Sequence, residues 1–179
     1  NVHDLSLNKN EILLIDSLHG LYDGMTSSIP PQKKFKVYIE TLGQFRGKDG
    51  TFMRWSDNRL LRRMIRDKDH RNLKPMQTLT HWHYVRRSEL KNIIPYIKAT
   101  DCIVNSALPY ELPVLKTMLF KYIAKAINSY REDPRRLDAH IRANRVFELL
   151  KHVKAVKDTA PIPPDSLLRE FIGGSRYRY

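Results

Sequence analysis

Four arginines with helical spacing are the residues of this sequence best suited to chemistry. Arg59, Arg62, Arg63 and Arg66 recur at intervals that place them on one face of a helix. A row of like charges is unfavourable unless an anion lies opposite it. The planar guanidinium group can hold phosphate oxygens through two parallel hydrogen bonds. The segment therefore predicts a phosphate-binding helix, and the alternative is a charged face that only meets solvent.

Asp16 and His19 form a second candidate site. Asp16 closes the run 11–16, whose four apolar residues predict a strand buried on both faces. In open α/β sheets, ligands bind beyond the carboxyl ends of the strands. A carboxylate in that place commonly holds Mg²⁺, and His19 could contact a substrate. The alternatives are a capping or turn aspartate and a hydrogen-bonded turn histidine.

The elements that must position these residues alternate between strands and helices. Besides 11–16, the segments 35–40 and 101–105 are predicted strands. The arginine helix is expected to be capped by Ser56 and Asp57, and further helices are predicted near 75–92, 113–130 and 135–154. The turn 131–134 predicts that the last two helices pack as an antiparallel pair.

This order predicts an α/β layer architecture with a parallel sheet flanked by helices. Three strands make a small sheet with unpaired edges, so part of the sheet is expected to come from another chain or from an absent N-terminal portion. The first residue is not Met, which fits a processed or shortened segment of a longer protein.

Composition limits the classes of partner and location. The 179 residues carry a formal net charge of +13, which favours anionic partners. Cys102 is the only cysteine, as expected for the reducing cytoplasm. No membrane span is predicted, because no apolar run approaches the roughly 18 residues required. No G-x-x-x-x-G-K-[ST] loop is present, so a backbone cradle for nucleotide phosphates is missing from this sequence.

Several stretches together resemble the uridine kinase and phosphoribulokinase group of P-loop phosphotransferases. The chain most resembles a uridine kinase-like branch whose kinase domain follows regions similar to parts of threonyl-tRNA synthetase. The matching segments are 12–21, 56–67, 85–89, 99–101, 105–108 with 110–112, and 167–175. The arginine helix and the sequence Phe-Ile-Gly-Gly-Ser at 171–175 are the most specific of them.

The resemblance implies that residues 1–179 are the C-terminal half of a doubly wound P-loop NTPase. Strands and a loop would occupy 1–55, arginine-rich lid helices 56–98, a strand with a helix pair 99–160, and a C-terminal tail 161–179. The fold would be incomplete without an N-terminal half that carries the P-loop lysine and the carboxylate that activates the nucleoside hydroxyl.

The same resemblance implies roles for the candidate residues in an ATP- and Mg²⁺-dependent kinase acting on a nucleoside-like hydroxyl. Arg63, Arg66 and Arg71 match lid arginines that close over the transferring phosphate, and Arg59 and Arg62 would support them. Asp16 matches the acidic strand-end residue associated with Mg²⁺, where relatives often carry Glu followed by Gly.

Two alternatives remain open. The first is a basic RNA- or tRNA-binding module without catalysis, which the net charge and the basic, tyrosine-bearing tail favour. The second is a non-catalytic remnant. Under the kinase hypothesis as well, the segment alone is expected to be inactive, because it lacks the phosphate cradle.

Overall fold

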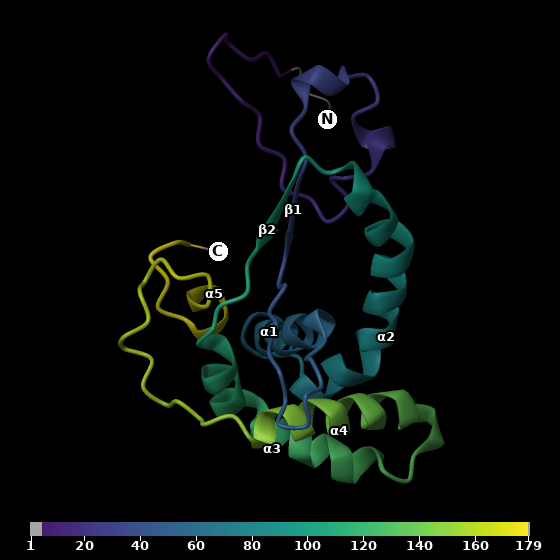
Figure 1. Ribbon diagram of the computed structural model, residues 1–179, viewed down its shortest axis with the longest axis vertical. Coiled ribbons are helices and arrows are strands. Elements are labelled where there is room, and N and C mark those ends of the chain that lie inside the picture. Colours follow the sequence, from purple (N-terminus) through teal and green to yellow (C-terminus); the bar gives the residue numbers. More distant parts are fainter. Residues whose placement is uncertain (1–4, 179) are drawn as a thin grey trace.

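The computed structural model describes residues 5–178, which form a mixed α/β structure (Figure 1). Its helices are α1 (Trp55–His70), α2 (Pro75–Asn92), α3 (Glu111–Tyr130), α4 (Leu137–Lys151) and the single turn α5 (Arg169–Ile172). The strands are β1 (Val37–Glu40) and β2 (Cys102–Asn105). The short 3-10 helices are η1 (Asp23–Met25), η2 (Pro31–Lys33), η3 (Ile94–Ala99) and η4 (Pro134–Arg136). The predicted α/β class is confirmed.

The sheet of the described residues contains two parallel strands. Val37 lies opposite Cys102, and Glu40 lies opposite Asn105 at the carboxyl ends. The strands predicted at 35–40 and 101–105 are therefore confirmed with shorter bounds. This sheet is not a complete doubly wound fold.

The strand predicted at 11–16 is wrong for this structure. The segment belongs to no strand, and Ile12 and Leu14 are 91% and 89% exposed. An apolar run becomes a buried strand only where a neighbouring edge pairs with its backbone and packed elements cover its faces. The described residues supply neither around 11–16, and Asp16 therefore does not end a strand.

The long helices match their predictions more closely than their caps do. Helix α1 begins at Trp55, directly after Arg54, and no side chain caps it. The predicted cap at Ser56 and Asp57 is therefore wrong. Asp57 instead accepts two hydrogen bonds from Arg145 of α4, at 2.7 and 2.6 Å. A bidentate charged pair competes successfully with a cap for the carboxylate.

The helices α3 and α4 form the predicted antiparallel pair. The rings of Phe120 and Phe147 stack with centroids 4.7 Å apart. Nearer the connecting turn, the His140 ring nitrogen Nδ1 lies 3.1 Å from the Ile127 carbonyl oxygen. From one contact to the next, the residue number rises in α3 and falls in α4, so the two helices run in opposite directions.

The hydrophobic core lies among the helices. Its fully buried members include Leu61 and Ile65 of α1, Leu79 of α2, Leu115 of α3 and Leu150 of α4. In Figure 1, α1, α3 and α4 form the lower part of the molecule, and α2 rises beside the two strands. Among the described residues, no helix is long and apolar enough to cross a membrane.

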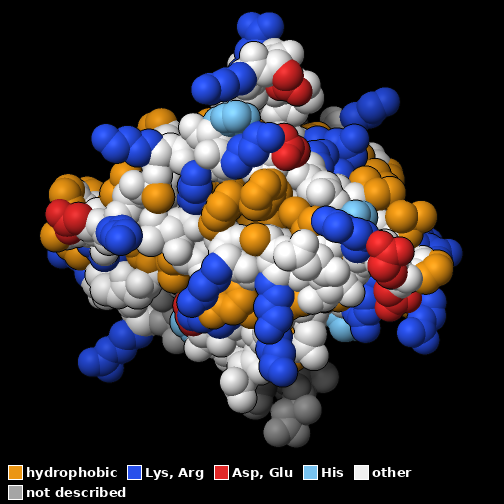
Figure 2. Space-filling model, turned by 90° about the horizontal axis from the view of Figure 1, so that it is seen from below, with side chains coloured by type: hydrophobic (Ala, Val, Ile, Leu, Met, Phe, Trp, Pro, Cys, Tyr) orange, Lys and Arg blue, Asp and Glu red, His pale blue; other side chains and the backbone are white. Residues whose placement is uncertain are grey.

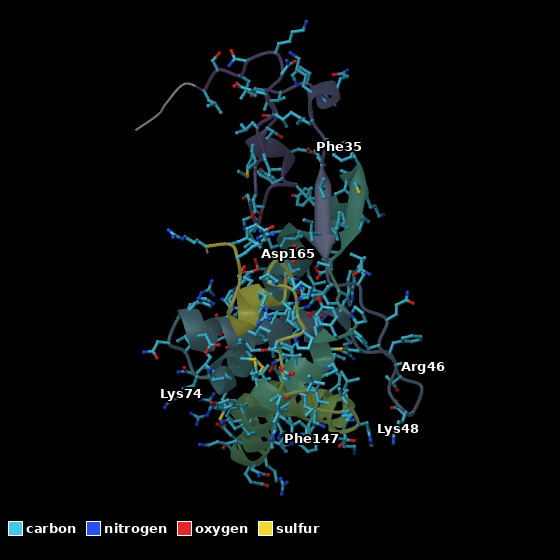
Figure 3. The ribbon with its side chains drawn as sticks, turned by 90° about the vertical axis from the view of Figure 1, so that its left-hand side faces the viewer. Phe35, Arg46, Lys48, Lys74, Phe147 and Asp165 are labelled. Carbon is cyan, nitrogen blue, oxygen red and sulfur yellow. The ribbon has the colours of Figure 1, made fainter. Side chains whose placement is uncertain are left out.

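The loop between β1 and α1 folds back on itself. The Gly47 N–H donates to the Thr51 carbonyl at 2.8 Å, and Gly50 turns the chain with a positive φ of 84° that glycine tolerates. This loop projects from the body of the molecule and carries Arg46 and Lys48 (Figure 3).

Candidate phosphate-binding site

Two of the arginines on α1 are held in ion pairs that join the helix to other elements. Arg62 donates from Nε to a Glu111 carboxylate oxygen at 2.8 Å and from Nη2 to the Ser106 carbonyl at 2.7 Å. Arg59 lies 3.2 Å from Glu40 and 2.6 Å from Glu89. Arg62 is nearly buried, so the alternative of a face that only meets solvent does not describe it. Both side chains anchor the fold.

The other three arginines are more open to solvent. Arg63, Arg66 and Arg71 have side chains 36%, 36% and 46% exposed. Arg63 Nε and Arg71 Nη1 share one oxygen of Asp67, at 2.7 and 3.0 Å. Arg66 pairs with Glu170 of α5. We refer to Arg63, Arg66 and Arg71 as the arginine cluster.

Contacts with neighbouring side chains hold the arginine cluster in place. Asp67 is buried and also accepts a hydrogen bond from the Thr78 hydroxyl at 3.0 Å. The guanidinium of Arg66 lies over the ring of Phe171, 4.9 Å from its centroid. Such contacts restrict the side chains before any ligand arrives, which lowers the entropy cost of binding.

The arginine cluster has an excess of positive charge. Three guanidinium groups face two carboxylates, and each group uses a single nitrogen in its pair. Burial lowers the pKa of Arg66, and repulsion by Arg71 and Arg63 lowers it further. A bound anion would relieve this repulsion, and free N–H donors remain to bind it.

The structure does not bring Asp16 or His19 to the arginines. Both residues are exposed, and among the described residues neither side chain forms an ion pair or hydrogen bond with α1. No group of three or more His, Cys, Asp or Glu side chains within 5–178 could hold a metal ion. Asp16 belongs to no such group among these residues. Its assigned role and that of His19 stay predictions.

Sequence reasoning missed the carboxylates that pair with the arginines. Glu111 precedes Leu115 and Leu119 at four-residue steps, which places it on the buried face of α3. Glu89 likewise follows Trp82 by two helical turns and is buried. An acidic residue in register with an apolar stripe signals a buried partner for a basic side chain, because unpaired charges are rarely buried.

Comparisons with known proteins found no matching family model, no matching curated protein and no matching solved structure.

Proposed function

We propose that this chain is the phosphate-binding part of an ATP-dependent phosphotransferase of the uridine kinase type. In this proposal, the arginine cluster contacts the phosphate that passes from ATP to a nucleoside-like hydroxyl. Arg59 and Arg62 keep α1 in position and do not touch the phosphate. The phosphate cradle comes from outside this sequence.

The observation that carries the proposal is the uncompensated charge of the arginine cluster. Arg59 and Arg62 are matched by buried carboxylates, whereas Arg63 and Arg71 must share Asp67. Phosphoryl transfer depends mainly on positioning and on neutralising charge on the transferred group. Guanidinium groups that retain free donors at a half-exposed site are suited to that task.

The first test is binding of inorganic triphosphate and ATP to the 179-residue chain, measured by calorimetry. Arg66→Ala is expected to lower the affinity about tenfold, as expected for loss of a charge-assisted contact. Arg87→Ala is the matched control, because Arg87 is exposed on α2 and has no ion pair among the described residues. This control is needed because basic side chains are spread over the surface, as the face in Figure 2 shows.

A second variant separates binding from folding. Glu170→Gln frees Arg66 from its carboxylate partner and is expected to raise the affinity for triphosphate. A merely structural Arg66 would give no more gain than the loss of one negative charge elsewhere on the surface. Equal losses in Arg66→Ala and Arg87→Ala would reduce the effect to net charge and remove the arginine cluster from the proposal.

The catalytic part of the proposal has its own test. The isolated chain is expected to leave uridine unphosphorylated in the presence of Mg·ATP, because the cradle for the ATP phosphates is missing. Robust phosphorylation by this chain alone would overturn its assignment as half of a site. The RNA-binding alternative instead requires an affinity for RNA that falls steeply as salt rises.

A further inference from the structure

We propose that a pocket at the start of α1 binds a nucleoside monophosphate. The pocket has a volume of about 440 Å³ and lies where α1, α2 and α4 meet. Its wall includes Arg54, Arg86, Arg142, Arg145, Trp55 and Trp82. No residue of the arginine cluster lines it, so this proposal does not rest on the proposed function.

Two of the four arginines are fixed by carboxylates. Arg145 donates two hydrogen bonds to the Asp57 carboxylate, and these bonds raise the pKa of the Arg145 guanidinium. Arg142 donates to Asp138 at 2.5 Å and to the Leu79 carbonyl at 2.6 Å. These pairs hold the wall of the pocket rigid and leave little charge unmatched there.

The other two arginines retain free donors. Arg54 is exposed and has no hydrogen bond or ion pair through its side chain among residues 5–178. Arg86 uses one nitrogen in its pair with Glu89. Arg54 also stands directly before α1, whose first N–H groups lack acceptors inside the helix and whose start carries no side-chain cap. An anionic group would meet both guanidinium donors and the positive end of the helix.

The tryptophans supply a place for a planar ring. Trp55 is 41% exposed and offers an accessible aromatic face. Trp82 is only 3% exposed, and its side chain forms part of the pocket wall. A planar ligand ring can therefore stack on Trp55 beside this wall.

Together these features select the class of ligand. Stacking on an aromatic side chain suits a nucleobase, and free guanidinium groups suit a phosphate. The volume of about 440 Å³ falls in the range of small-molecule pockets. A single-stranded nucleic acid presents these two groups repeatedly, whereas only two of the pocket's four arginines, Arg54 and Arg86, are held by fewer than two acceptors within residues 5–178, which suits one phosphate. We therefore commit to the free mononucleotide.

Intrinsic fluorescence tests this proposal directly, because both tryptophans of the chain line the pocket. Titration with AMP or UMP is expected to change the emission with saturation below about 1 mM. Arg54→Ala is expected to weaken binding about tenfold, whereas Arg66→Ala should leave it unchanged. A free tryptophan amide corrects for light absorbed by the nucleotide.

Three results would overturn the proposal. The first is emission that does not saturate with either nucleotide. The second is equal weakening by Arg54→Ala and Arg66→Ala, which would assign the signal to general attraction of anions. The third is much tighter, strongly salt-dependent binding of an oligonucleotide, which would assign the pocket to a polymer. If this proposal fails, triphosphate binding at the arginine cluster is unaffected, so the two proposals are separable.

Discussion

The helical part of the molecule consists of α1 to α4, and the strand-bearing part consists of β1, β2 and the segment before β1. The two parts differ in how far they bury apolar side chains. The residues of the main core, among those the structure describes, all come from position 53 onward. In contrast, Ile12, Leu14 and Ile39 are exposed, as is Ile103 of β2. The helical part therefore encloses a core, although it also exposes Leu90 and Ile141, whereas the other part has no described side chain in that core.

This difference follows from how the two kinds of element satisfy their backbones. A helix forms its hydrogen bonds internally and needs a neighbour only for its apolar stripe. A strand needs both a paired edge and covered faces. The helices α1 to α4 supply stripes to one another, while the sheet of the described residues has only the strands β1 and β2, and no further strand pairs with either. We expect the helical part to carry most of the stability.

Removing the buried acid of α3 is expected to have the largest effect. Glu111 is fully buried and pairs with Arg62, so Glu111→Ala would leave a guanidinium buried without its partner. Such a change costs about 3–5 kcal/mol of unfolding free energy. Urea denaturation measures it, and Glu148→Ala serves as the control because Glu148 is largely exposed in its pair with Lys151. A loss of unfolding free energy as small as that of the control would show that water hydrates the Arg62 guanidinium once Glu111 is removed.

Matched leucines test the comparison itself. Leu115 is fully buried in the core, and Leu115→Ala is expected to lower the unfolding free energy by about 2–5 kcal/mol. Leu14 is 89% exposed, and Leu14→Ala should change it by less than about 0.5 kcal/mol. Thermal and urea unfolding of both variants give the contrast. Similar losses would mean that Leu14 is packed in solution and that the two parts are alike.

The same physics explains how far the sequence predicted the structure. The apolar residues Leu60, Leu61, Met64 and Ile65 predicted the buried side of α1, and all four are fully buried. That pattern depends on residues within a few turns of one another. The run 11–16 looked like a strand by the same criteria, but strand formation depends on distant partners that a local pattern does not contain.

The candidate site shows a similar limit. The spacing of Arg59, Arg62 and Arg66 correctly predicted a shared helix, and it suggested an external anion for all of them. The carboxylate of Glu111 is 49 positions from Arg62, and that of Glu170 is 104 positions from Arg66. Pairing across such separations is set by helix packing, so spacing on α1 could not divide the stripe into anchored and half-exposed members.

Alkaline titration is expected to reveal the smallest difference between the two parts. Burial raises the pKa of Tyr38 in β1, with Glu40 adding to the shift, and burial also raises the pKa of Tyr130 in α3. The Tyr38 hydroxyl donates to Glu40 at 3.0 Å, whereas that of Tyr130 donates to the Met76 carbonyl at 3.0 Å. Both groups therefore keep their protons longer in the folded chain than in the unfolded one.

The sign of the pH effect follows from linkage. Above about pH 10 the unfolded tyrosines lose protons that the folded ones retain, so stability falls as pH rises, by at most about 1.4 kcal/mol per pH unit for each group. Tyr38→Phe and Tyr130→Phe each remove one contribution, which difference spectra of phenolate absorbance can isolate. If the strand-bearing part opens first, the Tyr38 phenolate appears before helical circular dichroism is lost, and the Tyr130 phenolate appears with that loss. If the two phenolates appear simultaneously, β1 unfolds together with the helices. The ion pair between Glu40 and Arg59 would then couple the sheet to α1 as strongly as the core couples the helices to one another.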